Sequence, residues 1–273
     1  MRLSPNLPAM KKSSFPLGGL VLLVLAVMFA ETAHPAVPTN AIARGEKFLA
    51  ELFDPELRLL PEFRGSKTYW LFHDNYLAAK LLAATQPKLA AELQQSLGRH
   101  GVTNSGKIEI IFGEAARPLP FRTYVLTNVA VVSGKTIRTE IVTERVLPGW
   151  EEYADLLLLA AIAQATNAPV EARRHFDRAA ALWDGRGFHD RVIAKQSPGQ
   201  KRYATYKLAL YLIAAGRLPQ PAPHAAEVRQ QLLALQNDAG GWITDYTPEG
   251  RPVGQANVET TCLALLAVKV NFK

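Results

Sequence analysis

Glu259-Thr260-Thr261-Cys262-Leu263-Ala264 begins with polar residues and continues into Leu265-Leu266-Ala267, a stretch of almost pure leucine and alanine. Three earlier segments share this design, and they begin at Asp74, Glu152 and Thr205. A helix that is apolar on nearly all sides is buried on all sides. A polar group in its first turn then needs a partner, a cavity or a ligand. We therefore expect these four helices to lie side by side, with their polar starts gathered at one end of a helical barrel.

The rest of the chain predicts a second set of helices, which are amphipathic and charged. The Leu/Ala helices are predicted at about 69–84, 150–166, 201–215 and 257–270, and the amphipathic helices at 41–52, 87–97, 169–182 and 223–236. The Leu/Ala type recurs every ~50–55 residues once an intervening strand region is set aside, and such periods indicate arrays of supersecondary units. The pattern predicts a mainly α, two-layer α/α toroid of about four helix pairs, closed or incomplete, with the Leu/Ala helices inside.

A small antiparallel β insertion is predicted at about 106–145. Its strands are expected at 108–112, 122–132 and 136–143, and Ser133-Gly134-Lys135 joins the last two as a hairpin. The insertion lies in one of four long links that lead from an amphipathic helix to a Leu/Ala helix: 53–68, 98–149, 183–200 and 237–256. Long loops on one face of a rigid scaffold commonly carry function. We therefore expect a site at this face, with the insertion covering the mouth of the cavity.

One motif links the chain to a known superfamily. Leu232-x3-Gln236-x3-Gly240-x-Trp242 resembles the QW repeat of the terpenoid-cyclase and prenyltransferase-like α/α toroids, and the resemblance covers about 230–270. It implies that Gln236 and Trp242 tie the end of an outer helix to the adjoining loop. The chain has no Asp-x-Asp-Asp motif of the squalene-hopene type cyclases and no Asp/Cys/His set at prenyltransferase zinc positions. The resemblance therefore supports the fold and not those activities.

Carboxylates and aromatic residues near the starts of the Leu/Ala helices are the candidate site. Carboxylates paired across a cavity can perform acid–base work on a glycosidic bond, and aromatic residues beside them suit a sugar. The candidate catalytic residues are Asp74, Glu152 and Glu259. The candidate ligand-binding residues are Trp70, His73, Asn75, Trp150, Tyr153, Asp184, Asp190, Tyr203, Tyr206, Asp245, Tyr246 and Asn257. The alternative for the acids and amides is structural, because such residues cap helices and form turns.

Composition excludes several classes of protein. The chain has 273 residues, 48% hydrophobic and 20% charged, which is typical of a globular protein. Three of its 31 basic residues precede the apolar N-terminal run, so the net charge of +7 overstates the charge of the remainder, and nucleic-acid binding has little support. The single cysteine, Cys262, cannot form an internal disulfide, and the six histidines show no metal-ligand spacing. We expect no metal and no cofactor.

The N-terminus predicts export. Residues 13–30 carry no charge and follow Lys11 and Lys12, as in a signal peptide or a membrane anchor. We assign 1–32 to this segment, 33–40 to a tether and 41–273 to the toroid domain. Basic residues before the apolar run place the domain outside the cytoplasm. The prediction is an extracytoplasmic, membrane-anchored domain, and the alternative is a protein secreted after cleavage.

Three functions stay open at this stage. The first is a membrane-tethered domain that binds a glycan or peptide at the long-loop face. The second is a hydrolase or lyase that acts on a polysaccharide through the cavity carboxylates. The third is a structural interaction module whose cavity is filled by its own side chains. The sequence does not decide whether the protein is an enzyme, and it does not indicate the oligomeric state.

Overall fold

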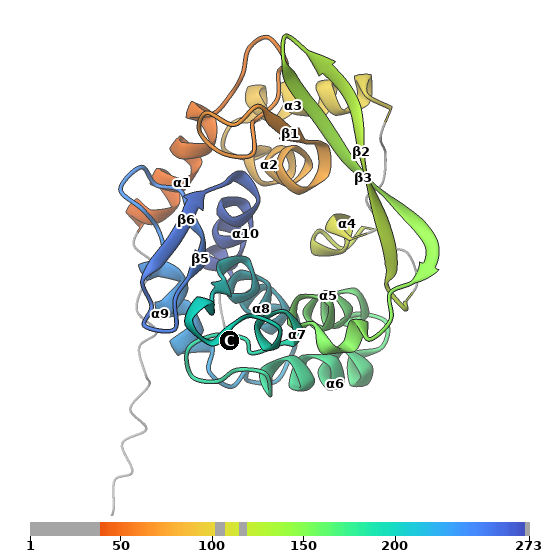
Figure 1. Ribbon diagram of the computed structural model, residues 1–273, viewed down its shortest axis with the longest axis vertical. Coiled ribbons are helices and arrows are strands. Elements are labelled where there is room, and N and C mark those ends of the chain that lie inside the picture. Colours follow the sequence, from red (N-terminus) through yellow and green to blue (C-terminus); the bar gives the residue numbers. More distant parts are fainter. Residues whose placement is uncertain (1–38, 102–106, 115–118, 271–273) are drawn as a thin grey trace, which may run out of the picture. The chain divides into compact units, whose positions relative to one another are not determined.

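The computed structural model describes residues 39–101, 107–114 and 119–270 (Figure 1). The predicted N-terminal anchor at 1–32 and most of the tether at 33–40 lie outside the described residues. The described part is a mixed α/β structure, ~48% helical, with ten α-helices and two small three-stranded sheets. Among the described helices, none combines the length and apolar character needed to cross a membrane.

All eight predicted helices are confirmed, with ends that differ by up to four residues, except that α2 begins at Leu77 and not at 69. The long helices are α1 Thr39–Glu51, α2 Leu77–Leu82, α3 Pro87–Arg99, α5 Ala154–Gln164, α6 Pro169–Ala180, α8 Thr205–Arg217, α9 Ala225–Ala234 and α10 Val258–Lys269. Two short helices are α4 Ile108–Ile111 and α7 Arg191–Ala194. A π-helical turn, η1 Leu71–Tyr76, leads into α2, and 3₁₀ turns occur at η2 Trp150–Glu152 and η3 Pro198–Gln200.

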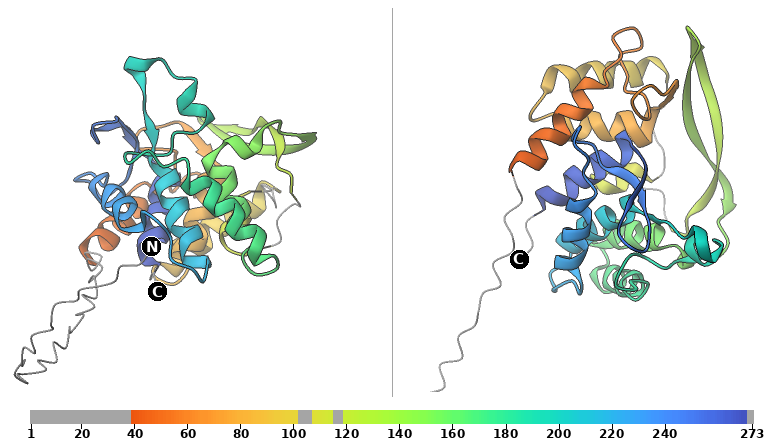
Figure 2. Two further views of the ribbon diagram at one scale, coloured as in Figure 1. Left: turned by 90° about the horizontal axis from the view of Figure 1, so that it is seen from below. Right: turned by 60° about the vertical axis from the view of Figure 1, so that its left-hand side comes forward.

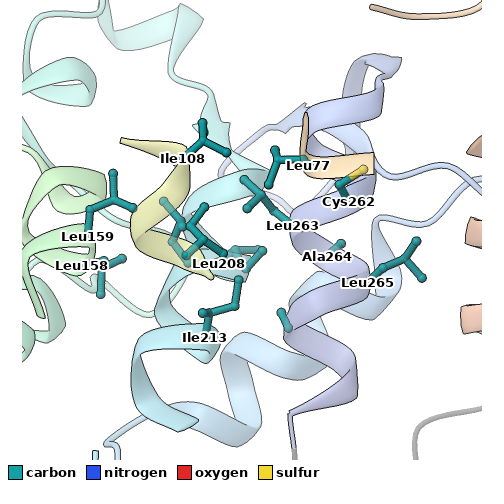
Figure 3. Packing of buried hydrophobic residues seen from close by; sticks show 14 of the residues in the cluster. Leu77, Ile108, Leu158, Leu159, Leu208, Ile213, Cys262, Leu263, Ala264 and Leu265 are labelled. Atoms are coloured by element: carbon teal, nitrogen blue, oxygen red, sulfur yellow. The ribbon is translucent and has the colours of Figure 1, made fainter. Parts of the chain in front are cut away.

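The four Leu/Ala helices pack in a row in the order α2, α10, α8, α5. Each also has an amphipathic helix against it: α3 packs on α2, α1 on α10, α9 on α8 and α6 on α5. Figure 3 shows the apolar side chains that α5, α8 and α10 contribute, with Ile108 of α4 beside them. Because these helices are apolar on nearly all sides, they need neighbours on several sides. The paired arrangement supplies those neighbours.

The first sheet contains the predicted hairpin. Strands β2 Arg122–Val132 and β3 Lys135–Val146 are antiparallel, and Ser133 and Gly134 form the turn between them. Strand β1 Thr68–Trp70 pairs in parallel with β3, so the sheet order is β1-β3-β2. Figure 2 shows the long hairpin standing to one side of the helices. The hairpin was predicted, and its parallel partner β1 was not.

Two expectations about strands are wrong. Residues 108–112 were predicted as a strand, but Ile108–Ile111 form α4 with three buried isoleucines. A short apolar run fits a strand and a buried helical turn equally well, so the pattern could not decide. Residues 237–256 were read as a loop, but they hold β5 Ile243–Tyr246 and β6 Pro252–Ala256. These strands join β4 Tyr203–Ala204 in a second, antiparallel sheet of order β4-β5-β6.

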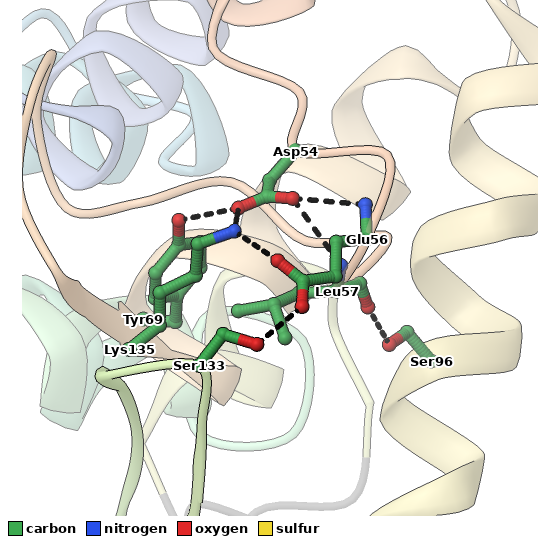
Figure 4. Close-up of polar contacts among 7 residues, drawn as sticks. All are labelled: Asp54, Glu56, Leu57, Tyr69, Ser96, Ser133 and Lys135. Carbon is green, nitrogen blue, oxygen red and sulfur yellow. Dashed lines mark hydrogen bonds and ion pairs between the residues drawn. The ribbon is translucent and has the colours of Figure 1, made fainter.

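The turn of the hairpin is tied to the loop that follows α1 (Figure 4). The Lys135 ammonium contacts Asp54 Oδ2 at 2.7 Å and Glu56 Oε2 at 2.6 Å. Ser133 Oγ donates to Glu56 at 2.6 Å, and the Tyr69 hydroxyl donates to Asp54 at 2.7 Å. At the other end of the hairpin, the ring of Phe121 meets the ring of Trp150 edge-on at 5.3 Å. The hairpin therefore connects the region of β1 and α2 with the start of α5.

The QW-like segment ties α1, α9, β5 and α10 together. Trp242 is fully buried, and its indole N–H donates to the carbonyl of Leu232 at 2.9 Å. Its backbone N–H donates to Thr261 Oγ1 at 3.0 Å. The Gln236 side chain donates to the carbonyls of Ala41 and Gly240, both at 2.8 Å. The prediction that Trp242 is buried against the end of an outer helix is confirmed.

We predict that Trp242→Ala lowers the free energy of unfolding by about 3–5 kcal/mol, because it empties a fully enclosed site and removes the hydrogen bond from the indole N–H to the Leu232 carbonyl. Urea unfolding followed by circular dichroism measures this change. Trp183→Ala, at a half-buried tryptophan, is the control and should cost less. An unchanged unfolding midpoint in Trp242→Ala would contradict a structural role.

Candidate functional site

A cavity of about 200 Å³ lies at the starts of the four Leu/Ala helices. Each helix or its preceding turn contributes one polar residue: His73 from η1, Asp155 from α5, Tyr206 from α8 and Glu259 from α10. Leucines one or two turns further along α5, α8 and α10 also line it. Residues of α4, with Lys107 before them, and Tyr124 of β2 supply more of the wall. The cavity is thus polar at the helix starts and apolar beyond them.

His73 lies between two carboxylates from different elements. Its Nε2 is 3.1 Å from Glu140 Oε2 of β3, and its Nδ1 is 3.5 Å from Glu259 Oε1 of α10. Lys107 Nζ approaches the same Glu140 oxygen at 3.0 Å and lies 4.1 Å from the centre of the Tyr124 ring. One ion network therefore joins η1, β3, α10 and the residue before α4.

The network shifts the pKa values of its members in opposite directions. Burial alone would lower the pKa of His73, but the charges of Glu259 and Glu140 outweigh it and raise that pKa. Burial would raise the pKa of Glu140, yet His73 and Lys107 hold it below its ordinary value. The pKa of Glu259 is raised, because burial outweighs the attraction of His73 and Lys107. His73 and Glu140 thus favour their charged forms, whereas Glu259 tends to keep its proton.

A second cluster of polar side chains lies near the starts of α5 and α8. The Tyr206 hydroxyl donates to Asp155 Oδ2 at 3.2 Å. Lys207 is almost completely buried; its ammonium is 2.5 Å from Asp190 Oδ2 and 4.0 Å from Asp155 Oδ1. Asp190 also accepts from the backbone of Ala154 and caps α7 through Val192 N. The charge of Lys207 is thus mainly engaged by Asp190, and Asp155 Oδ1 is buried with no hydrogen-bond partner among the described residues.

The three predicted catalytic acids have three different environments. Glu259 lines the cavity. Asp74 is 1% exposed and is not among the lining residues; burial, then the charges of Glu259 and Glu62, raise its pKa well above the ordinary value. Glu152 ends η2 with its side chain 60% exposed, 3.4 Å from Arg191. The acid that α5 brings to the cavity is Asp155, three residues further along.

The predicted aromatic residues are also dispersed. Tyr206 lines the cavity, and Trp70 stacks on His73 with ring centres 6.2 Å apart. Trp150 packs against Phe121 and His175 instead. Tyr153 has the guanidinium of Arg191 5.7 Å from its ring centre. Of these rings, the structure brings Tyr206 and Trp70 to the neighbourhood of His73.

Four predicted residues lie together around the second sheet. Tyr203 and Tyr246 are buried with ring centres 5.5 Å apart. The Tyr203 hydroxyl donates to Asp184, which also accepts from the backbone N–H groups of Arg186 and Gly187. Asp245 of β5 is partly buried, and burial raises its pKa. Asp184 therefore stabilises a turn, which is the structural role that the sequence offered as the alternative to ligand binding.

Both predicted asparagines have backbone partners. Asn75 is fully buried; it accepts from Leu60 N at 2.7 Å and donates to the carbonyls of Leu60 and Trp70. Asn257 caps α10 by accepting from Thr260 N at 2.8 Å. These contacts occupy both polar groups of Asn75 and the Oδ1 of Asn257, so both side chains serve the backbone.

Sequence reasoning missed four residues of the site: Asp155, Lys107, Tyr124 and Glu140. The signal for Asp155 was present, because it follows Ala154 at the start of a Leu-rich run. The other three, Lys107, Tyr124 and Glu140, lie in or near the β insertion. The position of this insertion beside η1 depends on the parallel pairing of β1 with β3. No local pattern specifies that pairing.

We predict that Asp74→Asn flattens the pH dependence of stability. An aspartate with a raised folded pKa keeps its proton while the unfolded chain releases it above about pH 4. The wild type therefore loses stability as pH rises from the unfolded pKa to the folded pKa, at about 1.4 kcal/mol per pH unit. Asparagine has no proton to release, so this loss should vanish. Urea unfolding across pH measures it, and an unchanged slope would contradict a neutral Asp74.

Chemically, the cavity offers carboxylate acceptors, an imidazole and a tyrosine to a small molecule. Within the described residues, no group of three or more His, Cys, Asp or Glu is arranged to hold a metal ion. Scans against models of protein families, and searches of curated proteins and of solved structures, find no match to this chain.

Proposed function

We propose that this protein is a membrane-tethered, extracytoplasmic domain that binds a small polyhydroxylated ligand, the unit of a glycan, in the cavity. One observation carries the proposal. Asp155, Tyr206 and Glu259 come from three separate helices to one cavity, and Asp155 Oδ1 is buried there without a hydrogen-bond partner among the described residues. The side chains of Asp155 and Glu259 are 22% and 27% exposed, so their carboxylates can accept from a ligand hydroxyl.

The size of the cavity supports a glycan unit over a peptide. About 200 Å³ is below the ~300–1,000 Å³ of pockets for drug-sized ligands, so one ring fits better than a backbone with its side chains. The apolar wall of leucines and the ring of Tyr124 suit the apolar face of a sugar, while the carboxylates accept from its hydroxyls. The presence of this cavity also favours a binding site over a barrel filled by its own side chains.

The proposed scaffold is an incomplete α/α toroid related to the QW-type superfamily. The row of four Leu/Ala helices, each with an outer partner, supports this assignment, as does the Gln236–Trp242 linkage. The proposed tethering rests on the charge and apolar pattern of residues 1–32. Such a chain would present the cavity outside the cytoplasm, where glycan polymers occur.

A hydrolase or lyase is the second candidate, favoured by the unequal environments of two acids. The pKa of Glu259 is raised by burial, and the charge of Asp155 contributes to the shift, so the two acids act on each other electrostatically. Asp155 receives a hydrogen bond from Tyr206 and has Lys207 nearby. Two carboxyl groups in such different surroundings fit a general acid and a base or nucleophile.

We predict that Asp155→Asn weakens glycan binding by on the order of tenfold or more, because a charged acceptor is worth about 1.5–3 kcal/mol. A glycan-array screen of the chain identifies the ligand, and titration calorimetry then compares the variants. Glu152→Gln is the matched control: it alters an exposed acid outside the cavity and should leave affinity unchanged. Equal losses in both variants, or no loss in Asp155→Asn, would count against the cavity.

For the enzymatic alternative, we predict that Glu259→Gln lowers turnover of a polysaccharide by about 10²–10⁴-fold, the usual contribution of a general acid. The amide keeps the size of the side chain and removes the proton. Release of reducing ends from the polysaccharide identified on the array measures turnover. If Glu259→Gln retains full activity while binding is intact, Glu259 is not the acid.

A further inference from the structure

The balance of charge around the cavity is negative when Glu259 is ionised. Three carboxylates, Asp155, Glu259 and Glu140, face two bases, His73 and Lys107, and both bases are in contact with Glu140. The third base nearby, Lys207, is paired with Asp190 at 2.5 Å. With every group ionised, the acids of this group, Asp190 included, exceed the bases by one charge.

The protein's own cations do not complete the hydrogen bonding of the acids. Tyr206 donates to Asp155 Oδ2, whereas Oδ1 lacks a hydrogen-bond partner among the described residues, and Lys207 stays 4.0 Å away. In the described part of the chain, Glu259 forms its ion contact with His73 Nδ1 at 3.5 Å, which is long for a charged hydrogen bond. Both acids lie in the first turn of a helix, where the helix dipole stabilises an anion.

That stabilisation is incomplete, because the pKa of Glu259 stays raised. Burial is the main cause, the charges of Glu140 and Asp155 add to it, and those of His73 and Lys107 oppose it. Asp74, Tyr206 and Cys262 also interact electrostatically with Glu259. A proton on Glu259 relieves the excess charge, and a bound cation would relieve it in the same way.

We propose that the ligand carries a positively charged ammonium group beside its hydroxyls, so that the cavity takes an amino sugar in preference to a neutral sugar. The inference rests on the proposed function and specifies the class of its ligand. The ammonium would lie between the carboxylates of Asp155 and Glu259 and donate to both. The hydroxyls and the ring would occupy the rest of the cavity, against the leucines and Tyr124.

The test compares three sugars that differ at one position: glucosamine, N-acetylglucosamine and glucose. The full-length chain in detergent is titrated with each at about pH 7, and dissociation constants are measured by ligand-observed NMR. We expect glucosamine to bind on the order of tenfold more tightly than the other two, the usual gain from a hydrogen bond with a charged partner. Its affinity should rise as the pH increases above the ordinary pKa of a glutamate and Glu259 loses its proton, while that of N-acetylglucosamine stays nearly constant.

Variants separate this inference from the proposed function. Asp155→Asn and Glu259→Gln should remove the preference for glucosamine, whereas Glu152→Gln should keep it. Equal binding of all three sugars overturns the inference and leaves glycan binding in place. Binding of cadaverine as tightly as glucosamine shows that the cavity takes any amine, and overturns the assignment to an amino sugar. If none of the sugars binds while the array also detects no glycan, the proposed function fails as well.

Discussion

The contact of His73 with Glu140 and Glu259 is the interaction on which the site depends. It joins a π-helical turn, a strand and the last helix, which are far apart in the sequence. Each of these groups would be costly to bury alone, because a buried charge needs a partner. The network makes polar helix starts compatible with a scaffold of leucine and alanine. It also fixes the hairpin relative to α10, since Glu140 lies on β3 and Glu259 on α10.

The polar groups at the helix starts divide into two sets with different chemistry. Lys207 and Asp190 satisfy each other in a nearly closed environment, and Asp190 has backbone donors as well. Asp155 and Glu259 are less completely satisfied and line the cavity. A fully paired buried ion pair supplies specificity of packing more than reactivity. The less satisfied acids are where a ligand gains free energy by binding.

The sequence predicted most of the helices, the hairpin and the burial of Trp242, because those features follow from local periodicity and from short-range motifs. It predicted a site at the starts of the Leu/Ala helices, where the structure has the cavity, but it chose Glu152 over Asp155, since α5 begins at Ala154 and a shift of three residues changes which acid faces the cavity. Helix ends are the least predictable feature of such patterns. Glu140 could not be predicted, because its place beside His73 follows from the parallel pairing of β1 with β3, a contact between segments nearly seventy residues apart. Ile108–Ile111 was misread because four residues are too few to show a period.

The position of α10 has a consequence for how the chain is made. This helix follows every other described element in the sequence, yet it packs against α2, α8 and α1, and Lys269 reaches Glu46 across 223 residues. During synthesis, the apolar sides of α2 and α8 that α10 covers stay uncovered until residues 258–269 have left the ribosome, long after α2 itself. Partly folded intermediates with exposed apolar surface aggregate readily and are the usual clients of chaperones. Loss of residues 258–269 would therefore remove a central part of the core and not its edge.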